Sequence, residues 1–158
     1  MGYLDKYFGG FRATSVVCYD AVVWYPMAAV NIVKGDVCID NGSGYATSAS
    51  ITAFTDTLLG IALTDGTNST GAAGDVSIPI ITPQPNIDFW VPNESATVAV
   101  QSDVGEQVDL ESEDGIDVTD VTLGTGWGFQ INKIDISAAA LVAAAGGFVR
   151  GRILADFA

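Results

Sequence analysis

The sequence predicts an all-β protein, a compact β-barrel or β-sandwich with an extended N-terminal arm. Helical periodicity is almost absent along its 158 residues. Short runs rich in β-branched and aromatic residues recur instead, and glycine, asparagine, aspartate and proline separate them. This spacing of short strands and turns is typical of barrels and sandwiches. The length is that of one domain, so we expect an arm at residues 1–20 and a single β domain at residues 21–158.

The first half of the chain is expected to form a run of short strands. They fall at residues 21–25, 36–40, 45–48, 57–64 and 75–81, and the end of the extended arm is the alternative for residues 21–25. Asn41-Gly42 is a strong hairpin signal, because both residues tolerate a positive φ. Gly60 lies inside the apolar run TLLGIALT, which indicates a bulge or a close backbone approach. The alternating apolar residues of 75–81 are expected on one side of their strand.

The second half is expected to continue this pattern around two irregular segments. Strands are expected at residues 96–100, 106–110, 126–134 and 148–155. Residues 83–92 contain three prolines, which cannot donate to a ladder. This segment is therefore an edge or a connection that can still hold a short strand at 87–91. The alanine-rich residues 137–145 form either a short helix, capped by Ser137 and stopped by Gly146, or a loop.

The N-terminal arm is the first candidate for contact with another molecule. Its aromatic and basic residues have no period that would bury them in one face, and they are Tyr3, Tyr7, Phe8, Phe11 and Arg12. Aromatic and arginine side chains commonly anchor interfaces, so we expect these residues to contact a neighbouring molecule. The alternative is that they join the core of the domain itself.

The charge balance argues against polyanionic partners. Six basic residues stand against nineteen acidic ones, and the formal net charge is −13. Nucleic acid is bound mainly through Lys and Arg, and anionic membranes attract the same residues. We therefore expect neither nucleic acid nor a membrane as a partner. The N-terminal residues have no apolar stretch behind a basic head, so no signal peptide is expected.

Residues that carry catalytic chemistry are sparse, so no enzyme, cofactor or metal centre is expected. The chain contains no histidine, which is the commonest general base and metal ligand. Cys18 and Cys38 are expected to be reduced core thiols. The carboxylates of residues 109–120 depart from the calcium-loop pattern, because Asp114 stands where glycine is needed. They are expected to form a solvated loop, and a weak calcium site at a subunit boundary is the alternative.

The tryptophans Trp24, Trp90 and Trp127 are expected in the core by default. Phe89 and Trp90 stand beside Pro92 in the predicted edge segment, where exposing a large aromatic pair is costly. Phe89, Trp90 and Trp127 are therefore candidates for a subunit interface. A host-facing carbohydrate-binding surface built on Trp90 or Trp127 is the other interpretation.

Several short motifs follow one another at predicted turns and strands. They are Gly35-Asp36-Val37, Gly44-Tyr45-Ala46, Leu59-Gly60-Ile61-Ala62 and Gly74-Asp75-Val76. Together with SATVAVQSDVGEQVDL and the closing GFVRGRIL, they resemble the small head proteins of tailed phages, a family that includes capsid decoration (cement) proteins. The resemblance covers residues 30–155, and the aromatic arm and residues 137–145 depart from it.

The resemblance implies a β-tulip-like structural protein of the virion. Such a protein is expected to bind the major capsid protein on the outer surface of the head, as a homotrimer, and to stabilise the shell. It would be synthesised in the host cytoplasm. A strong negative charge suits an outward-facing shell protein, because it keeps crowded copies soluble. Other virion parts, such as a head-fibre base, an adaptor or a tail protein, remain alternatives, as does the carbohydrate-binding module.

Overall fold

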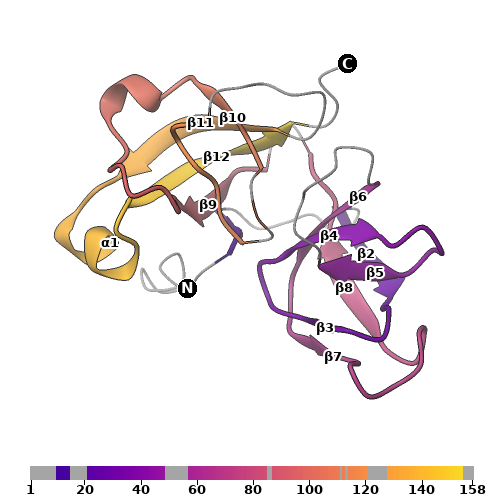
Figure 1. Cartoon of the computed structure of the whole chain (residues 1–158). Helices are drawn as coiled ribbons and strands as arrows, with labels where there is room; N and C mark the ends of the chain where they lie inside the picture. Colours follow the sequence, from indigo (N-terminus) through magenta and orange to yellow (C-terminus); the bar gives the residue numbers. More distant parts are fainter. Residues whose placement is uncertain are drawn as a thin grey trace.

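The computed structural model describes residues 10–14, 21–48, 57–84, 87–110, 112, 114–120 and 128–154. The protein is all-β, as predicted, and its strands pair in antiparallel sheets with little helix. In the described part of the chain they form two five-stranded sheets and a two-stranded ribbon rather than a closed barrel. The two larger sheets lie beside each other (Figure 1).

The first sheet has the strand order β1-β9-β12-β11-β10. Its strands are β1 (Arg12–Ala13), β9 (Phe89–Pro92), β12 (Phe148–Leu154), β11 (Gly128–Asp135) and β10 (Gln107–Asp109). The short strand expected at 87–91 exists, but it lies inside the sheet and not at an edge. This is possible because Pro92 ends the strand and the other prolines of the segment precede it, so Phe89–Val91 keep their N–H donors.

The second sheet has the order β2-β8-β6-β4-β5. Its strands are β2 (Val22–Pro26), β8 (Ser77–Ile81), β6 (Leu58–Ala62), β4 (Val37–Asp40) and β5 (Ala46–Ser48). The predicted hairpin is confirmed, since β4 pairs with β5 and Gly42 has a φ of +84°. The ribbon of β3 (Asn31–Ile32) and β7 (Gly66–Thr67) was not expected, because each strand is too short for a periodic signal.

Gly60 shows both features that its position in β6 indicates. Its φ is +142°, and a Cβ there would lie 2.0 Å from the carbonyl oxygen of Ile81. The register between β4 and β6 also shifts between Cys38 and Ile39, which marks a bulge. Only glycine allows β8 to approach β6 this closely.

The strands β4, β6 and β8 bury both of their faces. Side chains on one face, such as Val37 and Ile61, join a hydrophobic cluster that also contains Phe89 and Phe129 of the first sheet. Side chains on the other face join a second cluster with Ile32 of the ribbon; they include Cys38, Leu59, Ala62, Ile78 and Ile80. Val76 packs against this second cluster, as the alternation of residues 75–81 predicts.

Two segments outside the sheets test the remaining predictions of secondary structure, at residues 96–100 and 137–145. Residues 96–100 form no strand; Ala99 is buried in a loop that precedes the short 3-10 helix η3 (Gln101–Asp103). Residues 137–145 hold the helix α1 (Ala138–Ala143), and the Ser137 hydroxyl accepts the Ala140 N–H as its N-cap. The helical interpretation is therefore confirmed and the expected strand at 96–100 is wrong.

Residues 10–14 belong to the β domain and not to a separate arm. The Phe11 N–H donates to the Gly35 carbonyl at 2.9 Å, and the Thr14 N–H donates to the Asp88 carbonyl at 2.9 Å. These contacts tie the segment to the second and the first sheet respectively, so the predicted arm boundary at residue 20 does not hold for it. Tyr3, Tyr7 and Phe8 lie outside the described residues.

Candidate interaction surface

The first sheet brings candidates from the predicted arm and the predicted interface onto one face. Arg12 in β1 stands directly opposite Trp90 in β9, and Trp90 stands opposite Arg150 in β12. Lys133 in β11 stands opposite Arg150 in turn. Residues directly opposite each other in neighbouring strands project from the same side of a sheet. We call this side the basic face, and it comprises Arg12, Trp90, Lys133, Arg150 and Arg152.

The alternation of β12 explains why the basic face points away from the core. Val149 and Ile153 are buried in the cluster between the sheets, whereas Arg150 and Arg152 are only half-buried. Of the six Lys and Arg residues in the chain, Arg12, Lys133, Arg150 and Arg152 are on this face. Four of the chain's six cationic side chains are therefore gathered on one side of a sheet, which also carries the carboxylates of Asp88 and Asp135, in a chain whose net charge is −13.

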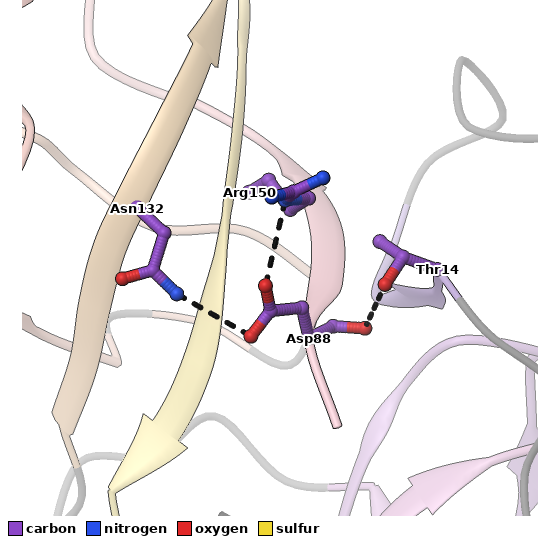
Figure 2. A network of polar contacts seen from close by, with 4 residues as sticks. All are labelled: Thr14, Asp88, Asn132 and Arg150. Atoms are coloured by element: carbon purple, nitrogen blue, oxygen red, sulfur yellow. Dashed lines mark hydrogen bonds and ion pairs between the residues drawn. The ribbon is translucent and has the colours of Figure 1, made fainter. Parts of the chain in front are cut away.

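Asp88 holds the middle of the basic face together (Figure 2). One carboxylate oxygen, Oδ2, lies 3.4 Å from Arg150 Nε, a separation that makes an ion pair rather than a well-aligned hydrogen bond. The other, Oδ1, accepts a hydrogen bond from Asn132 Nδ2 at 3.3 Å. The Thr14 hydroxyl donates to the Asp88 carbonyl oxygen at 3.2 Å. Asp88 thus connects β1, β9, β11 and β12 and restrains the Arg150 side chain.

Asp88 pairs with Arg150, whereas the contacts of the neighbouring Arg152 and Lys133 leave more of their positive charge for a partner. Arg152 donates to Gln130 Oε1 from Nε at 3.0 Å and from Nη2 at 2.7 Å, so its partner in this contact is neutral. Lys133 is exposed. A bulge between Ile131 and Lys133 makes Asn132 the extra residue of β11 and brings its amide to Asp88.

Arg12 also links the two sheets. Its Nη1 donates to the Lys34 carbonyl oxygen at 2.7 Å, across the turn that leads into β4. Gly35 of that turn has a φ of +95°, and a Cβ there would lie 1.9 Å from Arg12 Nη1. The predicted contact residue Arg12 is therefore half-buried and takes part in the protein's own structure.

Two of the predicted contact residues are core residues instead. Phe11 is 1% exposed and Phe89 is fully buried. Phe11 stacks edge-to-face on Phe89 and Phe129, with ring centroids 6.2 Å and 5.9 Å apart. The predictions that Phe11 contacts the capsid and that Phe89 forms a subunit interface are therefore wrong, because both rings point inward. Trp90 points outward and is half-buried, and Trp127 lies outside the described residues.

Sequence reasoning missed two surface features. Trp24, expected in the core, is 66% exposed on β2. The basic side chains of β12 were also missed, although the alternation in FVRGRIL places Arg150 and Arg152 on the side opposite Val149 and Ile153. That pattern was a usable signal for a polar outer face.

The ionisable groups elsewhere are held by local contacts. Burial, together with the nearby charge of Asp36, raises the pKa of the Cys38 thiol to about 12. Asp117 is slightly desolvated, yet the Thr119 hydroxyl and N–H and the Ser95 hydroxyl lower its pKa overall.

Within the described residues no group of three or more acidic or cysteine side chains is arranged to hold a metal ion. The same residues contain no helix long and apolar enough to cross a bilayer.

Comparisons with known proteins find no matching family model, no matching curated sequence and no matching solved structure. The functional proposal therefore rests on the residues of this chain and on their geometry.

Proposed function

We propose that this chain is a structural virion protein, a capsid decoration protein that binds the outer surface of a major capsid lattice and stabilises the head. The basic face is the observation that carries the proposal. An acidic protein with one basic face has a single orientation in which it can approach an anionic surface without repulsion. Within this face the Asp88 carboxylate is paired with Arg150, so the face keeps an excess of cationic side chains for an anionic partner.

The form of the basic face suits binding to a protein surface. It is built on paired strands, and the contacts of Asp88 with Arg150 and Asn132 restrain its side chains before any partner arrives. Pre-ordered side chains lose less entropy on binding. Trp90 stands between Arg12 and Arg150 in register, and tryptophan and arginine are the side chains most enriched at binding hot spots.

The motifs that resemble those of phage head proteins have a clear structural basis. Their glycines Gly35, Gly44 and Gly74 all have a positive φ, between +83° and +95°, just before β4, β5 and β8. The fourth motif contains Gly60 at the tight β6–β8 contact. These motifs therefore specify the turns and the close approach in the second sheet, and they support a shared architecture more directly than a shared partner.

The proposal is tested with capsids from particles that contain this chain, after the protein has been stripped from them. The double variant Lys133→Glu/Arg152→Glu leaves the Asp88–Arg150 contact intact and reverses the charge on the basic face. We expect rebinding to weaken by about tenfold or more, with a smaller salt dependence than the wild type shows. The control variant Lys34→Glu also replaces a positive charge with a negative one, but outside the basic face. The protein that carries it should rebind nearly as well as the wild type.

Electron cryomicroscopy of the re-decorated particles provides the second readout. We expect regular density over the outer lattice, with the basic face toward the shell. Density at one vertex or on the tail would instead assign the protein to a fibre, adaptor or tail structure. Wild-type rebinding by Lys133→Glu/Arg152→Glu would exclude the basic face as the attachment surface.

A carbohydrate-binding module is the second candidate, and Trp90 favours it. The indole is half-buried and shares its face with the amides of Gln130 and Asn132, the kind of side chains that hydrogen-bond to ligand hydroxyl groups. Glycan binding by the isolated protein that is lost in Trp90→Ala would support this function. Binding to capsids but to no glycan would leave the decoration role in place.

A further inference from the structure

The strand β2 is an uncharged edge of the second sheet. It pairs with β8 on one side and stands at the end of the strand order, and its outer side meets β5 just beyond Pro26, where Met27 is bridged to Ala46 and the Ala28 N–H donates to the Ala46 carbonyl at 2.9 Å. Residues 21–33 contain no charged side chain. Trp24 is 66% exposed and Val23 is 39% exposed. Natural edge strands are commonly protected by lysine, other charges or proline. Here Pro26 and the bridge to β5 protect the end of the strand, and the stretch that remains as an edge is residues 22–24.

The hydrogen bonds around β8 show which backbone groups of β2 face outward. The Pro79 carbonyl accepts the Leu63 N–H at 3.0 Å, so Pro79 directs its carbonyl away from β2. Trp24 stands opposite Pro79, and in an antiparallel ladder such a pair is non-hydrogen-bonded. The N–H and C=O of Trp24 therefore point away from β8.

The flanking residues confirm this alternation. The Ala21 carbonyl accepts the Thr82 N–H at 2.7 Å, and the Met27 N–H donates to the Val76 carbonyl at 2.8 Å. Odd-numbered residues of β2 thus face β8, whereas Val22 and Trp24 present their peptide groups at the outer edge. Within the described part of the chain these outward groups take part in no hydrogen bond.

We propose that two copies of this chain associate by antiparallel pairing of their β2 strands. In the register that places Val23 opposite itself across a two-fold axis, the N–H and C=O of Val22 meet those of Trp24 in the second copy. Such an interface is isologous, and it extends the second sheet across both molecules. The pairing covers the two exposed apolar side chains, with Trp24 beside Val22 of the second copy on one face and Val23 against its counterpart on the other.

Charge favours a second copy as the occupant of this edge. Two molecules that each carry a net charge of −13 repel one another, and contact is least unfavourable where neither contributes a charge. The stretch 21–33 meets that condition on both sides of a two-fold contact. The proposed pairing uses no residue of the basic face, so it does not rest on the function proposed above.

The proposal is tested off the capsid by sedimentation equilibrium of the full chain over a wide concentration range. We expect the wild type to form a dimer and Trp24→Lys to weaken dimerisation by at least about tenfold, because a buried lysine would be left unpaired at the contact. Val142→Lys adds the same charge at a side chain that is 89% exposed on α1, and it should dimerise like the wild type. Circular dichroism checks that both variants are folded.

Cysteine cross-linking tests the register. Val23 and its counterpart would form a non-hydrogen-bonded pair with Cα atoms about 4.5 Å apart, which is within disulfide range. In a Cys18→Ser background, Val23→Cys should therefore form a disulfide-linked dimer under mild oxidation, and Val142→Cys should not. A wild type that stays monomeric, a dimer unaffected by Trp24→Lys, or no cross-link at Val23 would each overturn the proposal. Lys133→Glu/Arg152→Glu should dimerise normally, which separates this outcome from a failure of capsid binding.

Discussion

Phe11 and Phe89 pack edge-to-face with their ring planes 76° apart, and this contact joins the N-terminal strand to the core. Phe11 belongs to the cluster that contains residues of both five-stranded sheets, and Ala13 packs against the same cluster. The intervening Arg12 points outward beside Trp90. Because side chains alternate along residues 11–13, Phe11 points into the core and Arg12 points to the surface.

Replacing Phe11 with alanine should destabilise the whole domain. A large-to-small change at a fully packed phenylalanine typically lowers the free energy of unfolding by about 3–5 kcal/mol. Urea denaturation followed by tryptophan fluorescence measures the difference. Val142→Ala, at a side chain that is 89% exposed, should change stability by less than about 0.5 kcal/mol. A loss below about 1 kcal/mol for Phe11→Ala would mean that the segment is not anchored by this ring.

Gly60→Ala should be among the most damaging single changes in the second sheet. The added methyl group would meet the Ile81 carbonyl oxygen, and the residue would keep a strained positive φ. Steric overlap and backbone strain together should lower the free energy of unfolding by about 3 kcal/mol or more. Gly42→Ala is the matched control, because its φ is +84° but no atom lies within 4 Å of the new methyl group. If thermal denaturation gives the same loss of stability for Gly60→Ala and Gly42→Ala, the close approach of β8 to β6 does not contribute to the effect of Gly60→Ala.

Asn93 is a buried polar centre, and its removal should be costly. Its amide donates to the carbonyls of Thr97 and Gly146 at 2.9 Å each, and its Oδ1 accepts the N–H groups of Ser95 and Val118. Asn93→Ala leaves several of these groups without a partner and should lower the free energy of unfolding by about 2–4 kcal/mol.

Asn132→Ala removes a single exposed amide contact and serves as the control for Asn93→Ala. Its loss should stay near 0.5–1 kcal/mol, the usual range of about one ordinary hydrogen bond. Chemical denaturation of both variants, side by side, provides the comparison. If the two losses are similar, the four contacts of Asn93 do not act as a buried centre.

The Cys38 thiol should be inert in the native state. Because burial raises its folded pKa to about 12, the thiolate that reacts with disulfide reagents scarcely forms at pH 8. In a Cys18→Ser background, labelling at pH 8 should proceed only as fast as the protein opens, and denaturant should accelerate it strongly. Rapid labelling of the folded chain would contradict the buried position of this thiol.

The same shift predicts a loss of stability in alkaline solution. The folded pKa lies above the unfolded value of about 8.5, so the stabilising contribution is complete below that value. It is lost as pH rises from there toward the folded pKa of about 12. The free energy of unfolding should therefore fall more steeply between these values in the wild type than in Cys38→Ala. Parallel pH profiles would show that Cys38 does not contribute to the decline.

Local sequence decides the features of this protein that depend on neighbouring residues. The β4–β5 hairpin follows from glycine at a positive φ, the α1 cap follows from Ser137, and the common side of Ile78 and Ile80 on β8 follows from alternation. Each of these depends on turn chemistry or on the period of a single strand, and both can be seen in a few adjacent residues. The same alternation indicates that Arg150 and Arg152 face away from Val149 and Ile153.

Tertiary structure alone decides which strands become neighbours. The basic face requires β1, β9, β12 and β11 to pair in that order, which brings Arg12, Trp90, Arg150 and Lys133 into one row. Alternation states which side of a strand a residue occupies, but not which distant strand lies next to it. Non-local pairing also placed β9 inside its sheet, buried Phe11, and left β2 and Trp24 at an edge. These outcomes depend on how much apolar surface the two sheets bury together, which cannot be calculated from any single segment of the sequence.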